Sequence, residues 1–444
     1  MFILFITHFF PPKYNAGTEN YTFGLARALQ ARGHKIQVIC AENWDNGNHY
    51  CNEITEDNYE GLAVQRIHLN WTRAADPNRV LYDSPKVERY LDDYIKRNNP
   101  DIVHVTSTYS LGIGVIRSAT RLNIPLVLTL MDFWFICPRT ILEKSNGQLC
   151  DGLTTSWECQ QCLLFYSGVY KLLHHLLSPK IEEKLWKHIS QKPRISRLRS
   201  ARGMALNMIE RKADMEEILN CPDVIISHSQ FVRDIFFMTG IVNKIVYLPN
   251  GHKLDWLTEY QGKTYSPNIR FGFIGQISEH KGVHVLINAY KNANLYDKSE
   301  LIIWGDLSRD PSYINQLSDD IDDCNQIILR GPFSRDQLPE VFSDIDVLVV
   351  PSLWYENAPL VIQEAFATET PVLTTNLGGM AEAVKHDVNG LLFERGNIDD
   401  LANQLQRITD EPGLIERLRE GVPPVKRIEE EVTELELIYQ QLVK

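Results

Sequence analysis

Short, continuous apolar runs alternate with helical patterns along the whole chain, and this alternation constrains the fold more than any other feature. In the first half such runs occupy residues 2–7, 35–40, 101–105 and 125–130. In the second half the pattern restarts, with runs at residues 270–274, 301–305, 326–331, 345–352, 371–376 and 390–393. Short apolar strands that alternate with helices are typical of a parallel sheet covered on both faces. The sequence therefore predicts an α/β protein with two doubly wound sheets.

The chain has 444 residues, which is more than one ordinary core requires, so two or three domains are expected. A turn signal, Pro249-Asn250-Gly251, separates the two halves. We place the first domain at residues 1–248 and the second at residues 249–425, followed by a helical segment at 426–444. Residues 137–220 interrupt the pattern of the first half and are interpreted as an insertion in that domain.

The bulk composition is that of a globular protein without a membrane span. Apolar residues make up 44% and charged residues 23% of the chain, and the net charge of −12 argues against a nucleic-acid partner. The apolar start ends at Pro11 and Pro12 and lacks the basic region and cleavage site of a signal peptide. No segment reaches the roughly 18 apolar residues that a membrane helix needs. We expect a cytoplasmic protein.

Two glutamates, Glu356 and Glu364, flank a proline in the otherwise largely apolar stretch WYENAPLVIQEA. Pro359 suits the first position of a helix, and the next backbone amides, beginning with Leu360, then lack acceptors within that helix. Such amides and the helix dipole attract phosphate, whereas carboxylates accept hydrogen bonds from hydroxyl groups. The arrangement suits a nucleotide-sugar, in which phosphate lies between two hydroxylated rings. On spacing alone, a role for Glu356 as a helix cap is the alternative.

An upstream turn adds a positive charge to this pattern. The stretch FGFIGQISEHKGV contains a strand, a turn at Gly275 and a helix start with Lys281, although the full G-x-G-x-x-G fingerprint is absent. A lysine ammonium can act as a point donor to a diphosphate. Ligands of open α/β sheets bind at the carboxyl ends of the strands. Lys281, Glu356 and Glu364 all follow such ends, so we expect them to converge.

These motifs resemble a known family. The stretches GQISEHKGVHVLINAY and PSLWYENAPLVIQEAFATETPVLTTNLGGMAEAV resemble the retaining family 4 glycosyltransferases (glycosyl transferases group 1) of the GT-B fold. Near the start, HFFPPKYNAGTENYTFGLARAL resembles the first glycine loop of that family. The resemblance implies two Rossmann-like domains that face each other across a cleft, with the C-terminal helix packing back on the first. It also implies transfer of a sugar from a nucleotide-diphosphate sugar to a glycan or lipid-linked glycan in polysaccharide or glycolipid synthesis.

The resemblance assigns roles to individual residues of the donor site. It implies that Lys281 contacts the donor diphosphate, that Glu356 approaches the sugar hydroxyls and that Glu364 binds the ribose. The amide of Leu360 touches phosphate, and Gly17 lets the first-domain backbone approach the same group. The acceptor is held mainly by the first domain. No protein nucleophile and no D-x-D motif on the expected loop are evident, which fits metal-independent transfer.

Three positions depart from the family pattern. Gln276 stands where arginine is frequent and belongs to the expected donor site, and Pro359 stands where glycine is frequent. Met131 precedes Asp132 where many members have His-Asp. Asp132 or nearby backbone is therefore interpreted as the substitute for that histidine, with reduced activity as the alternative. His104 is another polar candidate, although at a strand end we expect it to be a buried, hydrogen-bonded residue.

Two other functions compete with glycosyl transfer. A nucleotide-sugar-binding protein with little or no turnover accounts for Met131 and Gln276. A glycosidase that uses Glu356 and Glu364 as acid and base is chemically reasonable, but it leaves Lys281 and the helix N-terminus unexplained.

Cysteines cluster within the insertion, as Cys137, Cys150, Cys159 and Cys162 in the spacing C-x12-C-x8-C-x2-C. In a cytosolic chain such a cluster, ending in C-x-x-C, favours metal over disulfides. We expect a structural zinc that holds the insertion, with free thiols or a redox pair as the alternative. No cofactor is expected for the chemistry itself.

The rest of the insertion combines an apolar stretch at residues 163–177 with a basic run at residues 180–202. The basic run holds eight lysines and arginines against Glu182 and Glu183. A helix packed on the first domain and a solvated helix face are the ordinary interpretations. A peripheral patch for a lipid-linked acceptor at the inner membrane face is the alternative.

Overall fold

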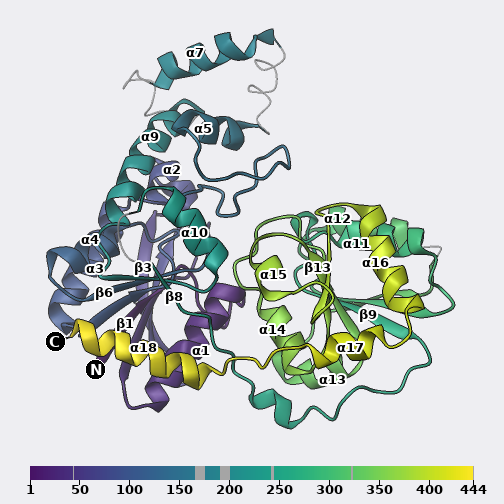
Figure 1. The fold of residues 1–444 in the computed structure, drawn as a ribbon. Helices are drawn as coiled ribbons and strands as arrows, with labels where there is room; N and C mark the ends of the chain where they lie inside the picture. The colour runs from purple at the N-terminus through teal and green to yellow at the C-terminus, as the bar shows by residue number, and fades with distance from the viewer. Residues whose placement is uncertain (44, 166–175, 191–200, 242–244, 322–323, 444) are drawn as a thin grey trace. The chain divides into compact units, whose positions relative to one another are not determined.

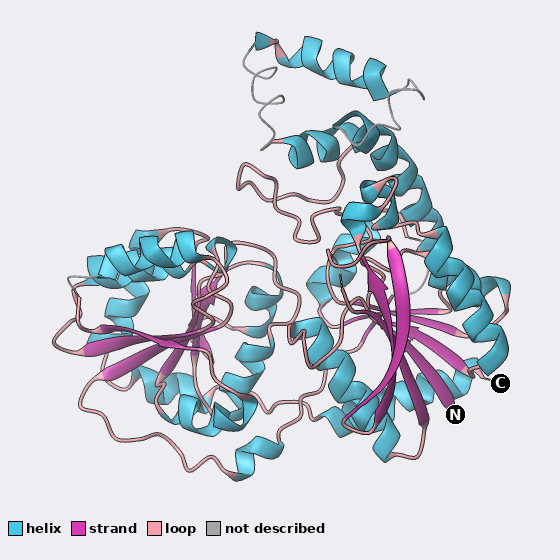
Figure 2. Ribbon diagram, turned by 180° about the vertical axis from the view of Figure 1, so that it is seen from behind, coloured by secondary structure: helices cyan, strands magenta, loops and turns pink. Residues whose placement is uncertain are grey.

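The computed structural model describes residues 1–43, 45–165, 176–190, 201–241, 245–321 and 324–443, which form two compact units (Figure 1). Unit 1 comprises Met1–Pro249 and Ile428–Lys444, and unit 2 comprises Asn250–Arg427. The sequence predicted domain boundaries after residues 248 and 425, close to the observed boundaries after Pro249 and Arg427. Figure 2 shows that helices cover both faces of the sheet in each unit.

The sheet of unit 1 has eight strands in the order β3-β4-β2-β1-β5-β6-β7-β8. They are β1 (Phe2–Ile6), β2 (Lys35–Ala41), β3 (Cys51–Tyr59), β4 (Leu62–Leu69), β5 (Ile102–Val105), β6 (Leu126–Leu130), β7 (Val224–Ser227) and β8 (Ile245–Tyr247). Neighbouring strands are parallel except β3 and β4, which form an antiparallel hairpin at one edge. The apolar runs of the first half correspond to β1, β2, β5 and β6. Strand β3 was not predicted because its residues are mostly polar and none is buried.

The helices of unit 1 are α1 (Gly17–Ala31), α2 (Pro77–Val80), α3 (Pro85–Asn98), α4 (Gly114–Arg121), α5 (Ser156–Leu164), α7 (Pro179–Ser190), α9 (Ala201–Ile218), α10 (Gln230–Met238) and α18 (Ile428–Leu442). Helix α1 begins at Gly17, the glycine that the family resemblance places near the donor phosphate. The insertion contributes α5, α7 and α9, and α5 packs against α9 (Figure 1). Its residues 166–175 and 191–200, which carry much of the expected membrane patch, lie outside the described residues. Within the described part of the chain, no helix is long and apolar enough to cross a bilayer.

The C-terminal helix α18 belongs to the core of unit 1. Tyr439 is fully buried, and its hydroxyl lies 2.5 Å from Nδ1 of His104 on β5. The other ring nitrogen of His104 lies 2.7 Å from Oγ1 of Thr129 on β6. Burial lowers the pKa of His104 to about 3, so the ring is neutral. A second buried contact joins the Tyr21 hydroxyl on α1 to Glu431, at 2.6 Å. His104 is therefore a buried, hydrogen-bonded residue, as its position at a strand end suggested.

Unit 2 contains a six-stranded parallel sheet in the order β11-β10-β9-β12-β13-β14. Its strands are β9 (Ile269–Ile274), β10 (Ser299–Trp304), β11 (Ile327–Gly331), β12 (Val347–Val350), β13 (Val372–Thr375) and β14 (Gly390–Phe393). All six match the apolar runs of the second half. The chain order reverses between β9 and β12, and ligands of open α/β sheets bind outside the strand ends at such a point.

The helices of unit 2 pack on both faces of this sheet and bury a separate apolar cluster on each. They are α11 (Val283–Ala293), α12 (Pro311–Ile321), α13 (Leu338–Ser343), α14 (Leu360–Ala367), α15 (Gly378–Ala383), α16 (Ile398–Asp410) and α17 (Leu414–Glu420). Short 3₁₀ turns add η1 (Trp71–Arg73) in unit 1 and η2 (Asp255–Thr258), η3 (Glu279–Lys281) and η4 (Arg335–Gln337) in unit 2. Two of these turns, η3 and η4, carry residues that contact the expected donor site.

Tyr439→Phe tests the attachment of α18. The substitution keeps the buried ring but leaves His104 Nδ1 without its hydroxyl partner, so we expect a loss of about 1–3 kcal/mol in the stability of unit 1. Scanning calorimetry of the full chain measures the loss as a downward shift of one transition. Leu437→Ala is the matched control on the same helix, because Leu437 is 56% exposed. Equal shifts for the two variants would contradict this account of the helix.

Candidate functional site

Two loops of unit 2 meet at the switch point of the sheet. One follows β9 and contains Lys281, and the other follows β12 and contains Glu356. Gly282 has a φ of +73°, and a Cβ atom added there would lie 2.1 Å from the carbonyl oxygen of Pro351. The backbone N–H of Leu353 donates to the carbonyl of His280 at 2.8 Å. The two loops thus approach each other so closely that no residue larger than glycine fits at the position of Gly282.

The joined loops bring Lys281 and Glu356 together, as expected, and the two side chains form an ion pair that was not predicted. Lys281 Nζ lies 2.6 Å from Glu356 Oε1. The same oxygen accepts from the Ser352 hydroxyl at 2.9 Å and from the indole N–H of Trp354 at 2.8 Å. Burial raises the pKa of Glu356, but Lys281 and these donors lower it by more, and the pKa ends below its ordinary value. Near neutral pH this side chain is therefore a carboxylate that accepts hydrogen bonds.

One aromatic ring, that of Trp354, lies beside the lysine. Lys281 Nζ lies 5.1 Å from the centre of the Trp354 ring, a distance at which a cation is attracted to the ring face. The His280 ring lies edge-on to Trp354 at 5.1 Å. Burial and then the charge of Lys281 lower the pKa of His280 to about 4, so this imidazole is neutral near pH 7. Sequence reasoning did not find Ser352, Trp354 or His280; the only signal was their closeness in sequence to the two charged residues.

Helix α14 begins one residue later than predicted. Pro359 has an extended backbone (φ −61°, ψ 118°) and precedes the helix, so its assignment to the first helical position was wrong. Its carbonyl accepts from the N–H of Ile362 at 3.1 Å. The first amide at the helix N-terminus is therefore that of Leu360. No side chain caps this helix. Because Glu356 Oε1 is engaged by Lys281, the alternative role of Glu356 as a cap is also wrong.

The second glutamate lies inside α14 and has a different partner. Glu364 is 7% exposed, and its Oε1 accepts from Arg335 of η4 at 3.0 Å. Burial raises the pKa of Glu364, and Arg335 only partly opposes that effect. The Arg335 side chain is 56% exposed, so it can leave the carboxylate at little cost. Gln276 is half-buried after β9 and provides no cation.

A second glycine, Gly379, also contacts the loop that contains Glu356. The N–H of Gly379, in the first turn of α15, donates to the carbonyl of Glu356 at 3.0 Å. A Cβ atom at Gly379 would lie only 1.6 Å from the carbonyl oxygen of Asn357. The position of Glu356 therefore depends on glycine both at Gly282 and at Gly379.

Unit 1 has its own polar group at the switch point between β1 and β5. His8 follows β1, and its Nε2 lies 3.3 Å from Oε1 of Glu19, which is in the first turn of α1. Burial raises the pKa of Glu19, but the hydrogen bond to His8 and the charge of His8 lower it by more, so this pKa is below its ordinary value. Asp132 follows β6 and accepts from the N–H of Trp134 at 2.7 Å. Burial raises the pKa of Asp132, against the opposing effects of that N–H, His8 and Arg211.

Several buried polar atoms near this group have no hydrogen-bond partner within the part of the chain that is described. They are Thr7 Oγ1, His8 Nδ1, Glu19 Oε2, Thr108 Oγ1 and Ser110 Oγ. Buried polar atoms are nearly always paired in folded proteins, and leaving one unpaired costs about 1–3 kcal/mol. This unit therefore offers donors and acceptors to a polar ligand. Gly17 begins α1 beside open space, since an added Cβ would meet no atom within 4 Å.

The sequence prediction for unit 1 named Gly17 and Asp132 but missed His8 and Glu19. The signal was present, because both residues stand in the motif at the start of the chain, on either side of the glycine turn. Met131, where histidine is frequent in the resembling family, packs against the apolar core of unit 1.

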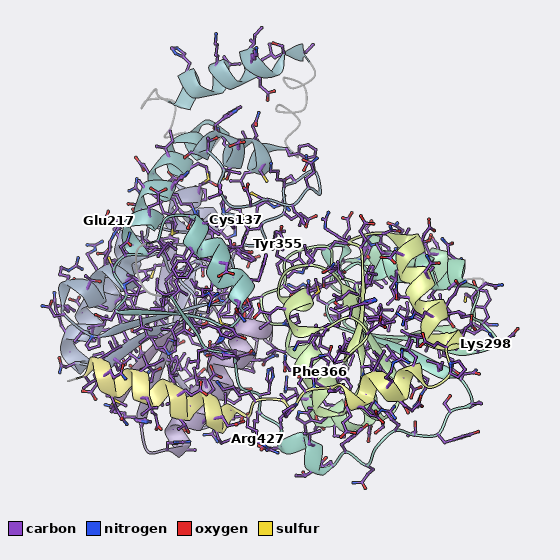
Figure 3. All side chains as sticks on the ribbon, viewed as in Figure 1. Cys137, Glu217, Lys298, Tyr355, Phe366 and Arg427 are labelled. Carbon is purple, nitrogen blue, oxygen red and sulfur yellow. The ribbon has the colours of Figure 1, made fainter. Side chains whose placement is uncertain are left out.

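The four clustered cysteines lie around one small cavity in the insertion of unit 1. All four are free thiols. Figure 3 labels Cys137 at the base of the insertion. Among the described residues, no three His, Cys, Asp or Glu side chains are already arranged as a set of metal ligands.

Family models match both units. A model of the glycosyl transferases group 1 matches residues 260–422, and a model of Glycosyltransferase Family 4 matches residues 15–150. The first match contains Lys281, Glu356 and Glu364, and the second contains Gly17 and Asp132.

Curated relatives match over part of their length. A galactosyltransferase of Escherichia coli, named for transfer from UDP-Gal to α-D-GlcNAc-diphosphoundecaprenol, is 34% identical over 149 residues, which are 32% of this chain and 37% of that protein. A D-inositol 3-phosphate glycosyltransferase of Nocardiopsis dassonvillei is 30% identical over 160 residues, or 34% and 37% of the two chains. The chain thus spans little more than a third of the length of these relatives.

Solved structures match over nearly the whole chain. Sucrose-phosphate synthase from Thermosynechococcus elongatus has a TM-score of 0.65 at 18% identity, and the match covers 99% of this chain and 98% of the synthase chain. Anabaena HepE, in complex with UDP and glucose, has a TM-score of 0.64 at 16% identity, with 99% of each chain covered. These likenesses confirm the predicted fold, with two Rossmann-like α/β units of the GT-B type.

Gly379→Ala tests the support of the Glu356 loop. The added methyl group cannot fit beside the Asn357 carbonyl, so the loop must shift, and we expect unit 2 to lose about 1–3 kcal/mol of stability. Calorimetry of the full chain measures this loss. Gly24→Ala is the matched control, because Gly24 lies within α1 and an added Cβ meets nothing within 4 Å. That control should be neutral or stabilising by up to about 1 kcal/mol. A Gly379 variant as stable as the wild type would show that the loop does not rely on this contact.

Proposed function

Because the chain belongs to the group 1, family 4 glycosyltransferases, we propose that it moves a sugar from a nucleotide-diphosphate sugar to a glycan or lipid-linked glycan with retention of configuration. The names of two relatives support this class of reaction, since one acts on a diphosphoundecaprenol-linked sugar and another on inositol phosphate. A structural neighbour that binds UDP and glucose supports the donor class. The proposed setting is the synthesis of polysaccharide or glycolipid.

The Lys281–Glu356 ion pair beside the start of α14 is the observation that carries this proposal. An ammonium group has three N–H donors, so Lys281 can keep Glu356 and still donate to a diphosphate. The amide of Leu360 and the helix dipole add to the positive potential at the same place. Glu356 is a carboxylate with a lowered pKa, and we propose that it accepts hydrogen bonds from hydroxyl groups of the donor sugar.

We propose that Glu364 binds the ribose of the donor. Its carboxylate is buried in α14, and Arg335 is half-exposed and free to move when a ribose hydroxyl takes its place. Gln276 stays in the proposed donor site of unit 2 as a neutral group, by its amide. The proposed role of Gly17, in unit 1, is supported by the open space next to its backbone.

The proposed chemistry is governed by the charge of the leaving diphosphate. As the bond from the sugar to the diphosphate lengthens, negative charge grows on the phosphate and positive charge on the sugar. Lys281 and the Leu360 amide stabilise the phosphate, which is the effect that usually contributes most to catalysis. A phosphate oxygen then takes the proton of the acceptor hydroxyl on the same face, which retains the configuration. We propose metal-independent transfer because the lysine and the amide supply the positive charge at the leaving group.

The proposed acceptor site is the polar group of unit 1. Its unpaired buried atoms suit a ligand with several hydroxyl groups. The His8–Glu19 pair supplies a histidine close to Asp132, although position 131 is methionine. Asp132, with its pKa raised by burial, stays a proposed catalytic residue that orients the acceptor hydroxyl.

The second candidate function is a nucleotide-sugar-binding protein with little or no turnover. Met131 favours it, because this side chain packs on the apolar core and provides no polar contact to a sugar. An assay of product therefore separates the two functions better than an assay of binding.

The proposed location is the cytoplasm, with a peripheral contact at the inner face of the membrane. Such a contact would bring a lipid-linked acceptor to unit 1. It is supported by exposed apolar side chains in the insertion, at Leu176 (71% exposed) and Ile181 (56% exposed). Lys180 and Lys184 are exposed in the same segment.

Lys281→Ala and Glu356→Ala are each expected to abolish transfer, by about a hundredfold or more, without unfolding the protein. Radiolabelled nucleotide-sugars are incubated with cell membranes and each variant, and label is counted in lipid and polysaccharide. Lys298→Ala is the control, since Lys298 forms an exposed pair with Asp410 in the same unit and lies away from Tyr355, the neighbour of Glu356 (Figure 3). Full activity in either test variant would refute the site. Tight donor binding by the wild type without any product would establish the second candidate function.

His8→Asn and Glu19→Gln are expected to raise the KM for the acceptor about tenfold or more and to leave donor affinity nearly unchanged. The cost of one unpaired buried group, about 1–3 kcal/mol, sets this scale. His34→Asn is the matched control, because His34 pairs with Glu436 at 2.8 Å elsewhere in unit 1. Steady-state kinetics with varied acceptor measures the change. An unchanged acceptor KM in both test variants would exclude this acceptor site while leaving the donor site in place.

A further inference from the structure

We propose that Cys137, Cys150, Cys159 and Cys162 bind one structural zinc ion that joins the parts of the insertion in unit 1. The proposal does not depend on the function of the donor site. All four residues line the same cavity, which has a volume of about 30 Å³. A space of this size holds an ion or one to two water molecules, and no larger ligand. Four cysteine thiolates around one ion form a common structural zinc site.

A small hairpin spans residues 142–150 and ends at Cys150. Cys150 is held next to Leu142, because its N–H donates to the Leu142 carbonyl at 2.8 Å. Between them, Glu143 and Leu149 form an antiparallel bridge. Cys137 precedes this hairpin. The hairpin therefore brings Cys137 and Cys150, which are far apart in sequence, to one side of the cavity.

Backbone amides face the sulfur atoms of this first pair. The backbone amides of Arg139 and Leu142 hydrogen-bond to the sulfur of Cys137. The backbone amide of Gly152, which has a φ of +78°, does the same for Cys150. An N–H that points at a sulfur stabilises the negative charge of a thiolate, and such groups commonly surround metal-bound cysteines.

The second pair lies on one helix. Cys159 and Cys162 are three residues apart in α5, so their side chains lie on the same face. A capping box between Thr155 and Glu158 fixes the start of this helix. The N–H of Ser145, in the loop of the hairpin, donates to Cys162 Sγ at 3.3 Å. The helix is thus already attached to the hairpin through a sulfur atom.

Thiol chemistry other than metal binding fits these residues less well. All four thiols are free, so the cluster forms no disulfide. When zinc binds, the ion replaces the thiol protons, which pass to solvent, and its two positive charges reduce the charge of the four thiolates from −4 to −2.

The proposed zinc site also supports the segment of unit 1 that carries Asp132. Cys137 lies five residues after Asp132, and the N–H of Cys137 donates to the Phe133 carbonyl at 2.7 Å. The N–H of Phe133 donates to the carbonyl of Thr140 at 3.1 Å. Loss of the ion is therefore expected to loosen the segment that carries Asp132.

The test is the metal content of the full-length chain. Protein purified from cells grown with zinc and without a metal-binding tag is expected to contain one zinc ion per molecule by plasma mass spectrometry. Cys137→Ser and Cys159→Ser should each lose most of that zinc. Cys51→Ser and Cys221→Ser are the controls, because both residues lie in unit 1 outside the cluster, and they should keep it.

Cobalt gives a readout that does not rely on the variants folding. The wild-type chain, stripped of metal under reducing conditions and then given Co²⁺, is expected to show the intense absorption of tetrahedral thiolate coordination at one equivalent. Zinc should displace the cobalt. A folded, reduced chain that contains far less than one zinc and shows no cobalt spectrum would overturn the proposal, as would a control variant that loses zinc as completely as Cys137→Ser.

Discussion

The approach of two loops at the end of the unit 2 sheet is the contact on which the proposed donor site depends. The loops are close because Gly282 and Gly379 have no side chains where a Cβ would strike a carbonyl oxygen. Only at that distance can Lys281 reach Glu356 and share its carboxylate oxygen with Trp354. The ion pair keeps a buried carboxylate charged, which burial alone would prevent. The two glycines thus allow the close approach of the loops, and this approach keeps Glu356 charged.

The two units differ in how they satisfy their polar groups. In unit 2 the charged residues already have partners, Lys281 with Glu356 and Arg335 with Glu364. The proposed donor therefore adds a contact to Lys281 and takes the place of Arg335 at Glu364. In unit 1, buried oxygen and nitrogen atoms near His8 and Glu19 have no partner among the described residues, and the fold carries their cost. Unpaired polar atoms at a switch point are typical of a ligand site. The insertion begins directly after this region, because the N–H of Cys137 donates to the carbonyl of Phe133, the residue after Asp132.

Much of the fold could be predicted from the sequence, since a strand buried on both faces is a continuous apolar run wherever it occurs. This holds for every strand of unit 2. It fails for β3, whose residues are mostly polar at the edge of its sheet, and β4, β7 and β8 were not predicted either. The start of α14 was misplaced by one residue, because proline is compatible both with a first helical residue and with the extended residue before it.

The sequence by itself determined the residue types of the donor site, since Lys281 and Glu356 belong to motifs with a local meaning, a glycine turn and a helix start. Only the tertiary structure decided which partners they have. The pairing of Lys281 with Glu356, and of His8 with Glu19, depends on strand order and on how closely loops approach. Local periodicity carries no information on either, because strand order is set by packing between distant segments. The protonation of each carboxyl group follows from those partners and from burial, and so it too was decided by the fold.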